Sequence, residues 1–152
     1  MLQNSLSIIK KGVYSKKKPS TNINNDISYG AFISYSIGRD DAGQCVVVKN
    51  RTIMAVQAYE ERKDTIQRGC SLSHNKACII IMNKLSNSDS DKVVINNDIL
   101  LSLKEYKAQA LALEENVYIE NIDEFIKNAN KLKLVVMSFN KDEIMDFVSK
   151  GK

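Results

Sequence analysis

Three carboxylates lie close together near the middle of the chain, and their chemistry would suit phosphate handling. Glu60 and Glu61 follow an apolar run, and Asp64 comes three residues later. Carboxylates at the end of a strand can hold Mg²⁺ together with the phosphates of a substrate. Acids in the first turn of a helix are also favoured for stability alone, because the helix N-terminus is partially positive. Both interpretations stay open for this cluster.

A second group of residues has the types that bind zinc. Cys70, His74 and Cys78 are spaced by four, and thiolates with an imidazole suit zinc. Only three such ligands are present, however, and Cys78 opens a run that is apolar on both faces. Free cysteine is commonly a small core residue. We therefore expect two buried cysteines and one surface histidine.

The carboxylates follow two apolar runs that predict a β-hairpin. The runs begin at Cys45 and Thr52, the turn lies at 49–51, and the second run leads to Glu60. The other elements follow from periodicity, caps and apolar runs. We expect helices at 21–37, 62–73, from 98, from 121 after an Asn121 cap, and near 144–148, strands at 77–82, 92–95 and 134–139, and a loop at 86–91.

Alternating strands and helices predict an α/β fold, a single domain with a mixed sheet, hairpins and flanking helices. Neither a GxGxxG segment nor a Walker-type loop occurs, so nucleotide sites of those kinds are unsupported. With 43% hydrophobic and 26% charged residues the composition is that of an ordinary globular domain. Three cysteines, an odd number, favour a reducing cytoplasm over a disulfide framework. A net charge of +4 is too small to indicate nucleic acid.

The basic residues are concentrated at the N-terminus. Lys10, Lys11 and Lys16 to Lys18 fall within nine positions. Such a cluster can meet an anionic membrane surface, and it can equally be a solvated linker ending at Pro19. We expect residues 1–20 to be a basic segment or linker and residues 21–152 to form the domain.

One segment has the order and spacing of a known family. Asp41-Ala42-Gly43-Gln44 is followed by Val46-Val47-Val48 and then by Met54-Ala55-Val56-Gln57, with Asp26 to Gly30 before them. From about Ile27 to Phe139 the chain resembles the C-terminal domain of the LpxI family, the UDP-2,3-diacylglucosamine pyrophosphatases of lipid A synthesis. The resemblance also implies a hairpin of 110–113 against 117–119, in a segment where Ala, Gln, Leu and Glu by themselves favour a helix.

The family's Glu-Gly-Thr-Asp motif, whose acid is associated with catalysis, is altered here. The chain reads Glu60-Glu61-Arg62-Lys63-Asp64. Without a gap, Lys63 stands in place of the acid. With a one-residue slip, Asp64 is that acid and Glu61 is the glutamate. Either way the Gly-Thr is missing.

Two further family segments are also altered. Lys84 to Asn87 stands for a Lys-Pro-x-Gln segment, and Asn96 to Leu100 stands for a Pro-Thr-x-Gly-Pro run. Family enzymes carry an N-terminal domain before this one, and 152 residues are about one domain's worth. The chain is therefore expected to be either a C-terminal fragment or a single-domain relative.

The resemblance implies a reaction and a set of residues. The reaction is hydrolysis of UDP-2,3-diacylglucosamine to lipid X (2,3-diacylglucosamine 1-phosphate) and UMP with Mg²⁺. Asp64 would be the catalytic and metal-binding acid with Glu61 as a second metal ligand, Gln44 would help form the substrate site, and Lys84 would neutralise phosphate charge. The expected partners are the substrate or lipid X, an N-terminal LpxI domain and a second copy of the chain. The expected location is the cytoplasm, with contact to the inner face of the cytoplasmic membrane.

Two other functions stay open. Loss of Gly-Thr, Pro and Gln at three segments favours a non-catalytic relative that binds ligand or dimerises. The lysines from Lys10 to Lys18 would fit an adaptor on a membrane surface. Whether the chain is an enzyme is therefore left open by its sequence.

Overall fold

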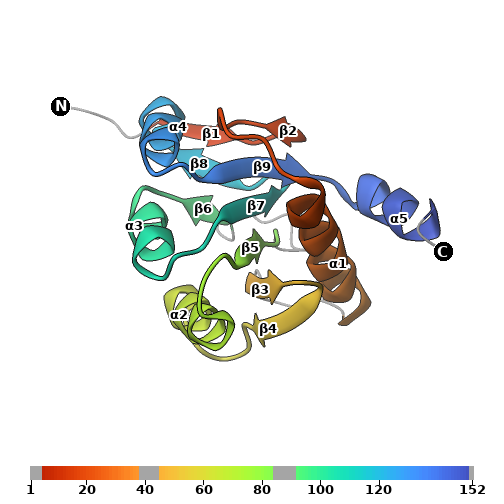
Figure 1. Ribbon diagram of the computed structural model, residues 1–152. Helices are drawn as coiled ribbons and strands as arrows, with labels where there is room; N and C mark the ends of the chain where they lie inside the picture. Colours follow the sequence, from red (N-terminus) through yellow and green to blue (C-terminus); the bar gives the residue numbers. More distant parts are fainter. Residues whose placement is uncertain (1–4, 38–44, 84–91, 151–152) are drawn as a thin grey trace.

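A six-stranded mixed sheet forms the centre of the fold (Figure 1). The computed structural model describes residues 5–37, 45–83 and 92–150. The strands lie in the order β2 (Gly12–Val13), β9 (Val135–Phe139), β7 (Ala110–Glu114), β5 (Cys78–Ile81), β3 (Cys45–Lys49) and β4 (Thr52–Val56). The three central strands β9, β7 and β5 are parallel, and the outer strands are antiparallel to their neighbours. The central strands are apolar without alternation because both of their faces are covered.

Two hydrophobic cores lie on the two faces of this sheet. Helices α1 (Thr21–Ile37) and α5 (Lys141–Lys150) cover the face that includes Ile80. Helices α2 (Arg62–Ser73), α3 (Asp98–Glu105) and α4 (Ile122–Lys131) cover the face that includes Ile79. Successive residues of one strand thus contribute to opposite cores, as the period of two requires.

A smaller sheet of three strands lies at one side of the large one. Its order is β1 (Leu6–Ile8), β8 (Tyr118–Glu120) and β6 (Val94–Ile95). The inner side chains, Ile95 and Ile119, are buried in the core beneath α2, α3 and α4. Strands β1 and β8 are antiparallel, and β6 and β8 are parallel.

The turn of the hairpin β3–β4 is hydrogen-bonded to an acid from another element. Asn50 and Arg51 at its turn both have positive φ angles, 51° and 56°, as a two-residue hairpin loop requires. The buried carboxylate of Asp26 in α1 accepts the backbone N–H of Asn50 at 3.0 Å and of Arg51 at 2.7 Å. The turn is therefore anchored to the helix that covers the sheet.

The α/β class and most of the predicted elements are confirmed. Helix α1 begins after Ser20, whose hydroxyl accepts the N–H of Ile23 at 3.2 Å. Helix α2 has the predicted bounds, Arg62–Ser73. Asn121 precedes α4 as predicted, but its side chain accepts the N–H of Ser5 instead of capping the helix. The predicted loop at 86–91 lies outside the described residues.

The predicted hairpin of 110–113 against 117–119 is wrong. Strands β7 and β8 form there but belong to different sheets. Strand β7 pairs with β5 on one edge and with β9 on the other, so neither edge is open to β8. After Glu114 the chain leaves the large sheet, and β8 pairs with β1 and β6.

The N-terminal residues contain two short strands that sequence patterns did not indicate. Strand β1 pairs with β8, and β2 pairs with β9. The division of the chain at residue 20 stays a prediction.

Candidate functional site

The junction between β4 and α2 presents the predicted acids. The N–H of Gln57 donates to the carbonyl of Cys45 at 2.8 Å, and its side-chain amide donates to the carbonyl of Glu60 at 3.0 Å. These bonds fix the path of the chain into the first turn of α2. Glu61 is the N-cap residue, and Asp64 lies in that first turn. The side chains of Glu61 and Asp64 are exposed.

Glu60 is engaged elsewhere. Its carboxylate accepts a hydrogen bond from the guanidinium of Arg68, which also donates to the carbonyl of Val56 at 3.3 Å. The bond from Arg68 lowers the pKa of Glu60 below its ordinary value of 4.5. Glu60 therefore joins α2 to the end of β4 and is the least available of the three acids for a ligand.

A cavity of about 190 Å³ lies between α2 and the start of α3. Arg62 and Lys63 line it from the first turn of α2. Asp98 lines it from the first turn of α3, and Asn96 lines it from the preceding segment, where its side chain accepts the N–H of Asp98 at 3.0 Å. The rest of the lining is Ile66, Val94, Ile99 and Ser102.

The cavity has the chemistry of an anion site. Burial lowers the pKa of Arg62, but a guanidinium stays charged at any ordinary pH. Arg62, Lys63 and the N-terminal end of α2 all favour a negative group, and Asp98 is the opposing charge in the lining. A phosphate group fits this balance better than a bare cation.

The predicted residues are distributed around this region in different ways. Asp64 shares the first turn of α2 with Lys63, but neither Asp64 nor Glu61 is part of the cavity lining. Gln44 and Lys84 lie outside the described residues. Nothing in the sequence indicated that Arg62 and Lys63 line a cavity, although the gap-free alignment already places Lys63 where the family has its acid.

Another polar cluster lies at the carboxyl end of β7. The carboxylate of Glu114 accepts the backbone N–H of Asn83 at 2.7 Å and the hydroxyl of Tyr35 at 2.5 Å. It thereby connects the ends of β5 and β7 with α1. The signal in the sequence is an acid that directly follows a buried apolar run, Leu111 to Leu113, and ends β7.

The residues that the structure describes do not form a metal centre by themselves. Among them, no group of three histidine, cysteine, aspartate or glutamate side chains could hold an ion. Burial raises the pKa of Cys45 and Cys78 to about 12 and of Cys70 to about 11, so these thiols are protonated at neutral pH. With the described residues, Mg²⁺ would fit where one or two carboxylates share the ion with phosphates of a substrate.

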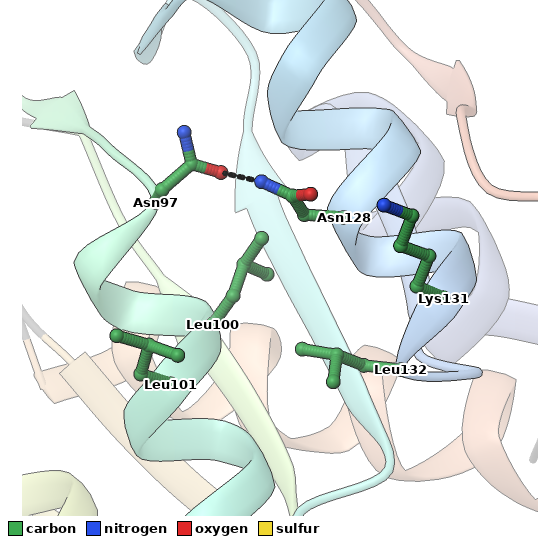
Figure 2. A pocket seen from close by; sticks show the side chains of 6 residues that line it. All are labelled: Asn97, Leu100, Leu101, Asn128, Lys131 and Leu132. Atoms are coloured by element: carbon green, nitrogen blue, oxygen red, sulfur yellow. Dashed lines mark hydrogen bonds between the residues drawn. The ribbon is translucent and has the colours of Figure 1, made fainter.

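A second cavity, of about 320 Å³, lies between α3 and α4 (Figure 2). Leu100, Leu101 and Leu132 form its apolar wall, and Lys131 lies at its rim. At one end the side-chain amide of Asn128 donates to Asn97 at 3.0 Å. The cavity has no acid among its lining residues and is separate from the α2–α3 cavity.

Comparison with known proteins gives the family. The model of the LpxI C-terminal domain matches residues 10–137, which is most of the chain. A search of curated proteins finds no match. No helix in the described part of the chain is long and apolar enough to cross a membrane. With its α/β architecture and this match, the chain belongs to the LpxI C-terminal domain family.

Proposed function

We propose that this domain binds the diphosphate of UDP-2,3-diacylglucosamine and acts in its hydrolysis to lipid X and UMP. The observation that carries the proposal is the pair of cations, Arg62 and Lys63, in the α2–α3 cavity of a chain from this family. A diphosphate is recognised by charge-assisted hydrogen bonds from such groups and from N–H groups of a first helical turn. The reaction belongs to lipid A synthesis.

Asp64 is the proposed catalytic acid, and Glu61 is the proposed second carboxylate. Both are exposed at the start of α2, the helix whose Arg62 and Lys63 line the cavity. Asp64 would accept a proton from, or orient, the attacking water. When bound, Mg²⁺ would neutralise charge on the phosphates, with Asp64 and Glu61 as its protein ligands. Gln44 and Lys84 remain proposed substrate-binding residues.

A non-catalytic, ligand-binding role is the second candidate. It is favoured by Lys63, which lines the cavity and stands in place of the family's acid in the gap-free alignment. A lysine there would bind the phosphates but could not replace a carboxylate, because an ammonium group donates hydrogen bonds and has no acceptor.

Release of UMP from UDP-2,3-diacylglucosamine with Mg²⁺ tests the proposal. The samples are the chain itself, Asp64→Ala, an EDTA control, and Asp123→Ala, which removes an exposed acid from the first turn of α4. We expect metal-dependent release that only Asp64→Ala and EDTA abolish. Lipid X binding by the folded chain, without turnover even after the N-terminal domain of a family enzyme is added, would favour the binding role. Absence of both binding and turnover would overturn the proposal.

The proposed partners are an N-terminal LpxI domain and a second copy of the chain, on the cytoplasmic side of the membrane. If the catalytic site needs the N-terminal domain, adding that domain from a family enzyme will start UMP release. UMP release by Asp64→Ala and by Asp123→Ala is then compared with the N-terminal domain present in both samples.

A further inference from the structure

The outer face of the three-stranded sheet bears apolar side chains that are partly exposed in the part of the chain that the structure describes. Leu6 and Ile8 on β1 are each 45% exposed. Ile8 pairs with Tyr118, and Tyr118 pairs with Val94, so these three side chains lie in one row across the sheet. Directly paired residues point to the same face of a sheet, and the alternate residues Ile95 and Ile119 point into the core.

Two lysines lie next to this row, Lys10 two residues after Ile8 of β1 and Lys92 two residues before Val94 of β6. The ammonium of Lys10 donates to the side chain of Asn116 at 2.6 Å, which holds it beside the turn before β8. The ammonium of Lys92 lies 4.9 Å from the centre of the Tyr118 ring. Glu120, which pairs with Leu6, places an acid on the same face. The face is thus apolar in its middle and cationic at one end.

The outer face continues into the α2–α3 cavity. Val94 is the common residue: it pairs with Tyr118 on the sheet, and it also lines the cavity with Arg62 and Lys63. A phosphate held in the cavity would therefore lie next to an exposed apolar surface.

We propose that the outer face, made of Leu6, Ile8, Val94, Tyr118, Lys10 and Lys92, contacts an anionic phospholipid bilayer. Aliphatic side chains and an amphipathic tyrosine ring enter the interface, and the two lysines attract anionic headgroups. An exposed apolar face next to lysines matches such a surface in both polarity and charge. Where the function proposed above holds, a lipid-linked diphosphate would reach the cavity with its acyl chains still in the bilayer.

Vesicle co-sedimentation without substrate tests the contact. We expect binding to vesicles that contain phosphatidylglycerol, weakened by salt, and little binding to pure phosphatidylcholine. Because each lysine near such a surface is worth about a fivefold change in affinity, Lys10→Gln with Lys92→Gln should weaken binding roughly 25-fold. Lys104→Gln with Lys107→Gln, which removes two exposed lysines near the end of α3, should leave binding unchanged.

A fluorescent probe locates the surface independently of charge. The chain has no tryptophan, so Ile8→Trp introduces a single reporter. Its emission should shift to the blue on adding phosphatidylglycerol vesicles. Leu72→Trp, at a site on α2 that is 59% exposed, is the control and should not shift.

The proposal is overturned if the folded chain does not bind anionic vesicles. It is also overturned if replacing Lys104 and Lys107 weakens binding as much as replacing Lys10 and Lys92. It also fails if only Leu72→Trp shifts. Self-association that buries Ile8, seen as a blue shift without vesicles that grows with protein concentration, would assign the face to a second copy. Because no turnover is measured, these results are independent of the UMP assay.

Discussion

Lys63 and Asp98 line the same cavity from the first turns of two different helices, α2 and α3. Their charges are opposite, so they should act in opposite directions on a bound phosphate. The cation attracts it and the carboxylate repels it.

The first prediction concerns the affinity for inorganic pyrophosphate and UDP, measured by calorimetry. Lys63→Ala should weaken binding about tenfold, because a charge-assisted contact of roughly 1.5 kcal/mol is lost. Asp98→Asn should strengthen binding by roughly fivefold, since it removes a repulsive charge worth about 1 kcal/mol. Lys104→Ala is the control for a general loss of positive charge. Equal effects of Lys63→Ala and Lys104→Ala would rule out the cavity as the phosphate site.

The second prediction concerns the dependence of stability on pH. The hydrogen bond from Arg68 lowers the pKa of Glu60 in the folded chain, so the unfolded chain binds this proton more readily. The contribution of Glu60 is therefore present above about pH 4.5 and is lost as pH falls through the folded-state value. The difference in Tm between the chain and Glu60→Gln should shrink as pH falls below 4.5. Glu105→Gln, at the exposed end of α3, is the matched loss of a carboxylate, and a similar trend there would contradict the assignment.

The third prediction concerns the anchor of the β3–β4 turn. Asp26→Ala leaves two backbone N–H groups, of Asn50 and Arg51, without their acceptor. We expect a loss of about 2 kcal/mol in the free energy of unfolding, measured with urea. Asp26→Asn retains one acceptor oxygen and should cost less. Asn24→Ala, an exposed change on the same helix, is the control, and an equal loss there would show that the turn bonds are not the cause.

Features that depend on neighbouring residues could be predicted from the sequence, and features that depend on contacts between distant segments could not. Helix α2 was predicted with its observed bounds, because its start after the hairpin and its end before the buried strand are visible in the residues themselves. The pairing of β8 was not predicted correctly. Strand β7 has β5 and β9 as its neighbours, and these pairings join segments that lie far apart in the sequence. Strands β1 and β2 are too short for any periodicity.

The candidate site was predictable in part. The junction after β4 could be identified from its acids and from the family resemblance. The side chains that line the cavity could not be identified from the sequence. The cavity forms because α3 packs next to α2, and these two helices are separate segments of the chain. In the sequence Arg62 and Lys63 are only departures from a motif, whereas in the structure both line the cavity.

The fourth prediction concerns the close approach of α2 to the sheet. A Cβ atom at Gly69 would overlap the side chain of Val47 on β3, and a β-branched side chain has little freedom to turn away. Gly69→Ala should therefore destabilise the fold by about 1–3 kcal/mol, although alanine is the better helix former. The control Ser71→Ala, on the exposed side of α2, should not destabilise the fold. Because the clash needs both side chains, Val47→Ala combined with Gly69→Ala should cost less than the sum of the two single changes in chemical unfolding. Additive losses would mean that Gly69 is needed for some reason other than its contact with Val47.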